Sequence, residues 1–298
     1  MIKIVRQIAR FDKHITVDLH KTLGKISPFV CNIMIAMNAI LMIPLLLGWV
    51  AGLLVNYLSD VLPVTRRFSQ PACPNCRAPY RWIEYLTFRA CSSCGRKRSL
   101  RTWLVLILGV ASYLYFWLSP PKALGFALAA ILLVYFGLIT VIDLEHRLIL
   151  HPTSLVGAVL GLGIGTFVQN KIHQGWIQGL GYSILGGIVG FGILLILYQF
   201  GALVTRMRAR RMRTAGQTTD DEEALGGGDV YLAGVLGLLL GWPFILNGIL
   251  LAVLIGGAVS ILFLIALLVR RRYSSEALMT FIPYGPYFVL SAFILLYL

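Results

Sequence analysis

Two aspartates stand where a polar loop meets a long apolar segment. Asp143 ends one apolar segment, and Asp229 follows Gly226-Gly227-Gly228 at the start of another. An ionisable residue at the edge of a membrane helix is costly to keep dry, so it marks a functional site by default. The glycines permit a tight turn and a close approach of other parts of the chain. A simpler interpretation is a glycine-rich turn in which the aspartate is the N-cap of the next helix.

Two carboxyl groups held close together form an acid–base pair. They cannot both ionise cheaply, so the pair holds one proton between them. The charged member can take a proton from water while its neutral partner donates one to a peptide carbonyl, which hydrolyses a peptide without a covalent intermediate. The alternative for two aspartates at a membrane edge is a path for a cation or a proton in a transporter.

Four of the five cysteines form a second set with chemical meaning. Cys73-Pro-Asn-Cys76 and Cys91-Ser-Ser-Cys94 are two C-x-x-C motifs separated by residues 77–90. Four thiolates at this spacing suit tetrahedral Zn²⁺, and a site with four cysteine ligands has no open position, so the metal would be structural. A pair of disulfides is the weaker alternative, because we expect the loop on the cytoplasmic side, where thiols stay reduced.

The composition places these residues in an integral membrane protein. The chain is 58% hydrophobic and 13% charged, whereas soluble proteins carry about 25% charged residues. No apolar run alternates like a barrel strand, so we expect an all-α, polytopic transmembrane helical bundle. The net charge of +14 is concentrated in a few loops, which is typical of a cytoplasmic membrane face. This distribution favours membrane lipids as partners and argues against nucleic acid.

The sequence predicts about eight apolar helices. They cover residues 29–62, 103–118, 123–142, 153–169, 179–205, 230–246, 248–269 and 280–298. Alternation across the membrane places the basic loops 64–102, 143–152, 206–228 and 270–279 on one side, which should be cytoplasmic. Asp143 ends the third helix and Asp229 begins the sixth, so both carboxylates should lie at the cytoplasmic face, where they can converge. Glycines within 157–165 and 179–192 are interpreted as helix-packing positions.

We divide the chain into four parts. They are a basic N-terminal segment with the composition of an amphipathic helix (1–28), a first transmembrane region (29–63), a cytoplasmic tetracysteine loop (64–102) and a transmembrane core (103–298). The first region ends with Asn56, Asp60 and Pro63, which we interpret as its exit into water. Alternation would place the basic segment 1–28 outside, so either this segment lies along the membrane surface or the first apolar run, 29–62, is a re-entrant pair.

Three stretches resemble the type IV prepilin peptidase family. The stretch IDLEHRLI at 142–149 resembles that family's first aspartate motif, and Gly226 to Asp229 resemble the GxGD motif of the wider group of intramembrane aspartyl proteases. The stretch IPYGP at 282–286 resembles the family's C-terminal proline–glycine–proline motif. The order and spacing of the motifs also match, and the resemblance covers roughly residues 45–298.

The resemblance implies that Asp143 and Asp229 are the catalytic pair of an endopeptidase in the bacterial inner membrane. Its substrates would be prepilins or pseudopilins, cut after a glycine at the cytoplasmic face. In the family, the tetracysteine loop separates bifunctional enzymes from peptidase-only relatives, so the resemblance also implies N-methylation of the new N-terminus with S-adenosylmethionine. Candidate substrate-binding residues are Glu145, close to Asp143, and Gly226 to Gly228, beside which a small side chain would fit. The acidic run 220–223 could hold a basic leader, although a solvated loop is the simpler interpretation.

Two positions depart from the family pattern. His151 stands near the place where the family often has Pro-Asp, and Tyr231 stands where a lysine is common. These departures concern substrate binding and local electrostatics rather than the type of reaction. Two alternatives remain open at this point. One is a peptidase without methyltransferase activity, and the other is a non-enzymatic transporter or scaffold that uses the aspartates for ions and the loop for partners.

Overall fold

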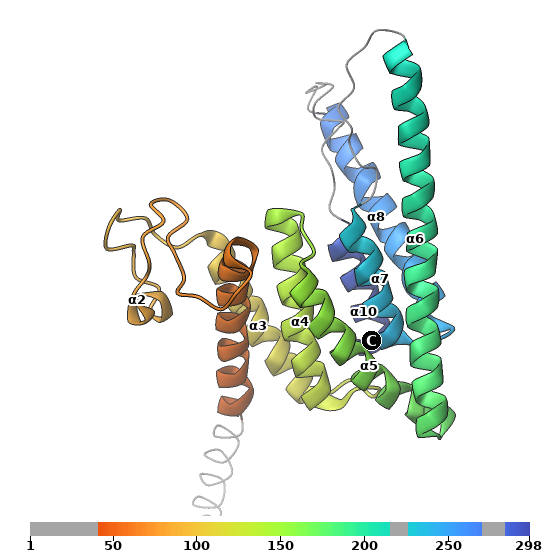
Figure 1. The fold of residues 1–298 in the computed structure, drawn as a ribbon. Helices are drawn as coiled ribbons and strands as arrows, with labels where there is room; N and C mark the ends of the chain where they lie inside the picture. Colours follow the sequence, from red (N-terminus) through yellow and green to blue (C-terminus); the bar gives the residue numbers. More distant parts are fainter. Residues whose placement is uncertain (1–40, 215–225, 270–283) are drawn as a thin grey trace, which may run out of the picture.

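The protein is an all-helical bundle in the computed structural model, which describes residues 41–214, 226–269 and 284–298 (Figure 1). Within these residues, the β pairing is limited to an isolated bridge between Ala72 and Pro79. Six helices are long and apolar enough to cross a membrane. They are Leu41–Thr65, α3 (Leu100–Leu118), α4 (Gly125–His146), α5 (His151–His173), α6 (Trp176–Thr214) and α8 (Phe244–Val269). The predicted polytopic helical bundle is therefore confirmed.

Two further apolar helices are shorter than predicted. They are α7 (Gly227–Leu240) and α10 (Gly285–Tyr297), with 14 and 13 residues. At about 1.5 Å per residue each is about 20 Å long, less than the roughly 30 Å of a bilayer's hydrocarbon core. With the six long helices, they account for the eight apolar segments expected from the sequence. The helix α2 (Trp82–Leu86) lies within the tetracysteine loop and was not predicted.

The core of the bundle forms around α7, which packs against α5 and α6. Glycines make this close packing possible, as predicted for the glycine-rich parts of α5 and α6. A methyl group on Gly165 of α5 would lie 1.9 Å from the carbonyl oxygen of Leu238. On Gly237 of α7, it would lie 2.2 Å from the carbonyl oxygen of Gly186 in α6. The helix backbones therefore touch, which fixes the position of α7 and its first turn.

The bundle can be divided into two parts, and Phe116 of α3 lies in the hydrophobic core of the larger part. We call the helix Leu41–Thr65, α3 and the tetracysteine loop the two-helix unit, and the remaining helices the main bundle. A cavity of about 410 Å³ separates them in the middle of the bundle, with walls from Leu41–Thr65, α3, α4 and α10. The hydroxyl of Tyr113 in α3 donates a hydrogen bond of 2.7 Å to the carbonyl oxygen of Ala130 in α4 at one end of the bundle.

Residues Asn56 and Asp60 do not mark an exit into water, so that interpretation is wrong. The helix continues to Thr65. Asn56 is buried and donates hydrogen bonds to the carbonyl oxygens of Gly52 and Thr102, which ties this helix to α3. The segment 1–28 and the acidic run 220–223 lie outside the described residues.

Candidate functional site

Asp143 lies in the last turn of α4, and its side chain is buried, with 5% of the residue exposed. The helix ends three residues later, at His146. Arg147 then adopts the left-handed conformation (φ 51°), and its N–H donates to the carbonyl oxygen of Asp143 at 2.9 Å. This is a common way for a helix to stop, although glycine usually holds the left-handed position. The turn directs the chain into α5 while leaving the Asp143 side chain inside the bundle.

The start of α10 lies directly against the Asp143 carboxyl group. A methyl group on Gly285 would lie 2.5 Å from Oδ2 of Asp143, so this position has no room for a side chain. Pro286 follows in the first turn of α10, where its missing N–H costs no helix hydrogen bond. The N-terminal end of a helix favours a nearby negative charge. The glycine and second proline of the predicted C-terminal motif therefore have a structural reason, while Ile282 and Pro283 lie outside the described residues.

Asp229 is the third residue of α7 and has 8% of its surface exposed. It is not the N-cap of that helix, because the N-cap position belongs to Gly226. The three glycines differ in their surroundings. A methyl group on Gly228 would lie 2.8 Å from Cβ of Ile149, whereas one on Gly227 would meet no atom of the described residues within 4 Å. Close packing therefore requires a glycine at position 228, and the described part of the chain does not require one at position 227.

The three motifs meet at one end of the main bundle, where α4 ends and α7 and α10 begin (Figure 1). Ile149, the last residue of the first motif, packs against Gly228 of the second. Asp143 and Asp229 are close enough for the charge of one to act on the other. Oδ2 of Asp143 is buried and has no hydrogen-bond partner among the described residues. The arrangement thus presents a buried pair of carboxylates with unused hydrogen-bonding capacity.

The two positions that depart from the family pattern contact each other. The rings of His151 and Tyr231 lie 5.4 Å apart, edge to face. His151 begins α5, and Tyr231 is in the second turn of α7, two residues after Asp229, so the contact joins these two helices beside the carboxylate pair. The residues at the two departing positions, His151 and Tyr231, therefore pack against each other in this chain.

Glu145, a predicted substrate-binding residue, already has a partner. It follows Asp143 by two positions in α4, and its Oε2 accepts a hydrogen bond of 2.6 Å from Nη1 of Arg101. Arg101 lies at the start of α3, in the two-helix unit. Sequence reasoning missed this pair, because neither residue belongs to a motif that points to the other.

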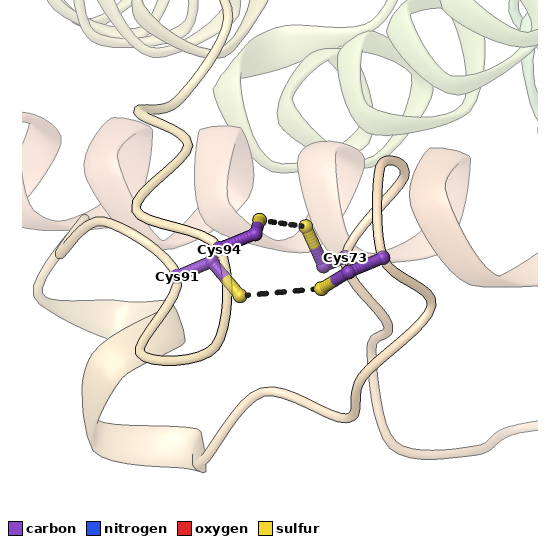
Figure 2. Close-up of side chains that lie close together, drawn as sticks. Cys73, Cys91 and Cys94 are labelled. Carbon is purple, nitrogen blue, oxygen red and sulfur yellow. Dashed lines mark hydrogen bonds between the residues drawn. The ribbon is translucent and has the colours of Figure 1, made fainter.

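The four motif cysteines come together in the tetracysteine loop. Cys73 and Cys94 have their Sγ atoms 3.6 Å apart, and the Sγ atoms of Cys76 and Cys91 are 3.7 Å apart (Figure 2). All four sulfur atoms lie within 4.8 Å of one another. A disulfide needs a separation of about 2.05 Å, and these cysteines are free.

The geometry of the cysteine cluster fits a metal ion. Four sulfurs at about 2.3 Å from a tetrahedral Zn²⁺ lie about 3.8 Å from one another. Each C-x-x-C motif forms a turn, which we call a knuckle, and the two knuckles have the same backbone hydrogen bond. The N–H groups of Arg77 and Gly95 donate to the carbonyl oxygens of Cys73 and Cys91, respectively. Both donors have positive φ angles, 57° and 70°. The loop thus forms two equivalent turns that aim four sulfur atoms at one point.

The thiol groups of the cluster have unequal acidities. Burial opposes ionisation of Cys73, but backbone N–H groups of Cys76 and Asn75 outweigh it and lower its pKa to about 6. The N–H of Ala78 favours the Cys76 thiolate, yet burial and the other three cysteine side chains outweigh it and raise its pKa to about 12. Metal binding requires all four thiols to be deprotonated, and a bound cation would favour the thiolate form of each.

Comparisons with known proteins agree with the motifs. The sequence profile of the type IV leader peptidase family matches residues 127–261, which include both aspartates but neither the tetracysteine loop nor α10. A prepilin leader peptidase/N-methyltransferase of Myxococcus xanthus (strain DK1622) is 26% identical over 231 residues, which are 74% of this chain and 62% of that protein. A protein of the same name from Pectobacterium carotovorum subsp. carotovorum is 28% identical over 209 residues, which are 64% of this chain and 63% of that protein. No solved structure matches the chain.

The matched regions span a little over three fifths of the length of these two curated relatives. The resemblance that the motifs predicted is confirmed. Together with the six long apolar helices, these matches make the chain a multi-pass membrane protein.

Proposed function

We propose, from the match of residues 127–261 to the type IV leader peptidase family, that the chain is a membrane aspartyl endopeptidase with Asp143 and Asp229 as its catalytic pair. The observation that carries this proposal is the meeting of two buried carboxylates, that of Asp143 in α4, which lies against Gly285, and that of Asp229 in α7. Neither carboxylate has a basic partner within hydrogen-bonding distance among the described ion pairs. The pair is therefore not explained as a structural salt bridge.

In the proposed reaction, the two carboxylates share one proton and one negative charge. The ionised member takes a proton from a water molecule, which attacks the peptide carbonyl, while the protonated member donates its proton to the carbonyl oxygen. The N-terminal ends of α7 and α10 stabilise the negative charge of the pair. None of the described residues would contact a methyl group on Gly227, so they leave room there for the substrate backbone beside Asp229.

We propose prepilins or pseudopilins as the substrates, because both relatives are named prepilin leader peptidase/N-methyltransferase. The active site would lie at the cytoplasmic face of the bacterial inner membrane. The supporting observation is that the basic tetracysteine loop and the carboxylate pair occupy the same end of the bundle (Figure 1). The basic loops would contact anionic membrane lipids rather than nucleic acid.

The cysteine cluster is proposed to hold a structural Zn²⁺ through Cys73, Cys76, Cys91 and Cys94. The sulfur separations support this assignment, and four thiolate ligands leave the metal no open position for catalysis. The names of the relatives favour a second activity, N-methylation of the new N-terminus. S-adenosylmethionine, which the resemblance implies as the methyl donor, has no assigned residues in the described part of the chain.

The proposal is tested by the intact mass of a prepilin co-expressed with this protein. Loss of the leader together with one added methyl group supports both activities. Loss of the leader alone supports the peptidase and removes the methyltransferase. If the prepilin stays unprocessed while a known peptidase cleaves it in parallel, the chain is not a prepilin peptidase, and a transporter or scaffold becomes the better interpretation.

A further inference from the structure

We infer that Arg101 is a positioning residue that ties the tetracysteine loop to the end of α4 that carries Asp143. This inference rests on the proposed peptidase function. The central observation is that one guanidinium group binds a carboxylate in each part of the bundle. Nη1 donates to Oε2 of Glu145 at 2.6 Å, and Nη2 donates to Oδ1 of Asp60. The side chains of Arg101 and Asp60 are 20% and 23% exposed, so the surrounding protein shields this pair from much of the solvent, whereas Glu145 is 40% exposed and its pair with Arg101 is partly open to solvent.

Asp60 connects Arg101 to the cysteine cluster. Its other carboxylate oxygen, Oδ2, accepts a hydrogen bond of 2.7 Å from the hydroxyl of Tyr85 and lies 3.9 Å from Nη1 of Arg98. The guanidinium of Arg98 lies over the rings of Tyr80 and Tyr85, at 4.4 and 4.1 Å from their centres. The contacts of the Arg98 guanidinium with these two rings fix its position relative to the loop.

The same two tyrosines form the small core of the tetracysteine loop. Tyr80 and Tyr85 are buried together with Cys73 and Cys91. A metal bound by the four sulfurs would therefore also hold Tyr80 and Tyr85, the two rings that contact Arg98, in place. A continuous series of contacts leads from the cysteine cluster through Asp60 and Arg101 to Glu145, which lies two residues from Asp143.

This connection matters at the carboxylate end of the bundle, because the aromatic contacts of α3 with α4 and α10, made by Tyr113, Phe116 and Trp117, lie at the opposite end. The cavity of about 410 Å³ lies between the two parts of the bundle. At the carboxylate end, Leu62 of the two-helix unit packs against Ile142 and Leu150 of the main bundle. Ile142 directly precedes Asp143. The Arg101–Glu145 ion pair thus holds the apolar contact that supports the catalytic turn of α4.

Arginine is required for this geometry. Its planar guanidinium presents separate N–H groups to two carboxylates, whereas the ammonium group of lysine is a compact point charge on a flexible chain. We therefore expect Arg101→Lys to retain the charge but recover only part of the positioning.

The inference is tested by the steady-state cleavage of a prepilin by full-length protein in nanodiscs. Because a small misplacement of a catalytic group costs up to about 100-fold in rate, we expect Arg101→Gln and Glu145→Gln each to lower kcat by about 10-fold or more, with KM changed less than about twofold. The double variant should be no slower than the slower single variant, since both remove the same contact. Lys97→Gln is the matched control, because Lys97 is exposed on the same loop and carries the same charge.

Three results would overturn the inference. The first is a wild-type kcat for Arg101→Gln. The second is additive losses in the double variant. The third is a raised KM with unchanged kcat for Glu145→Gln, which would instead make Glu145 a binding residue for a basic leader. If the wild-type protein cleaves no prepilin, the proposed function fails, and the connection is then judged by Tm alone. It stands if Arg101→Gln and Glu145→Gln lower Tm equally and non-additively, and it falls if neither lowers Tm.

Discussion

The sulfur atoms of the cysteine cluster all come from residues 73–94, whereas the carboxylate site takes Asp143, Asp229 and Gly285 from three separate helices. The cluster is built from two short turns with the same backbone hydrogen bonds. Its geometry therefore depends on local chain conformation and on the metal. The carboxylate site has no such local frame, because its parts meet only when α4, α7 and α10 pack correctly.

This difference predicts how each region responds to damage. A local cluster fails when a ligand is lost but tolerates small shifts of the surrounding helices. A site assembled from helix ends fails when one added methyl group separates those ends. The closest approaches at the carboxylate site, Gly285 to Asp143 and Gly228 to Ile149, are therefore its most sensitive points.

Among changes that leave both catalytic carboxylates in place, the largest effect on cleavage is expected for Gly285→Ala. The new methyl group would lie 2.5 Å from Oδ2 of Asp143 and must displace α10 or the carboxylate. We expect prepilin cleavage to fall by about 100-fold, the cost of roughly 1 Å of misplacement, while cysteine-bound metal is unchanged. Gly192→Ala in α6 is the control, because a methyl group there meets no atom within 4 Å. Normal cleavage by Gly285→Ala would show that the site is not assembled as tightly as described.

A second variant, in the cysteine cluster, should affect metal binding more than peptide cleavage. Cys91→Ser removes one of four sulfur ligands, and we expect metal affinity to fall by more than about 100-fold, since even the loss of an outer contact costs about 10–100-fold. Cleavage should fall less than in Gly285→Ala, because the carboxylate pair itself is intact. Metal content is measured on purified protein, with Ser93→Ala in the same knuckle as control. Unchanged metal content in Cys91→Ser would refute the metal assignment.

The smallest effect is expected for variants that exchange the residue types at equivalent positions of the two knuckles. Arg77 and Gly95 occupy equivalent left-handed positions, with φ angles of 57° and 70°. Because a side chain costs about 1–2 kcal/mol in this conformation, Arg77→Gly should stabilise the metal-bound loop by about 1 kcal/mol. Gly95→Ala should destabilise it by about the same amount. The measurement is the denaturant midpoint for metal release, and midpoints that shift in the same direction for both variants would contradict the equivalence of the turns.

The sequence was most informative where chemistry and spacing coincide. The cysteine spacing predicts the cluster because all its ligands lie in one loop. The two aspartates could be predicted because alternation of apolar helices places them at the same membrane face. The lengths of α7 and α10 could not be predicted, since an apolar run does not show where a helix begins.

Polar contacts between residues far apart in the chain also could not be predicted from the sequence. Asp60 resembles an exit into water, because a charged residue near a helix end usually faces solvent. Its partner Arg101 is 41 residues away, on another helix. Likewise, Glu145 resembles a free acid beside the site until α3 is seen to bring Arg101 against it. Such pairs depend on how helices are arranged, and no local pattern records that arrangement.

The central claim is that Asp143 and Asp229 act as one catalytic pair. Its most direct test is the rate of leader release by Asp143→Asn, Asp229→Asn and the double variant, in protein that inserts normally and retains its metal. Loss of an acid–base group costs about 10²–10⁴-fold, so we predict a loss of at least about 1000-fold for each single variant and no further loss for the double. Near-normal leader release by either single variant would contradict the claim.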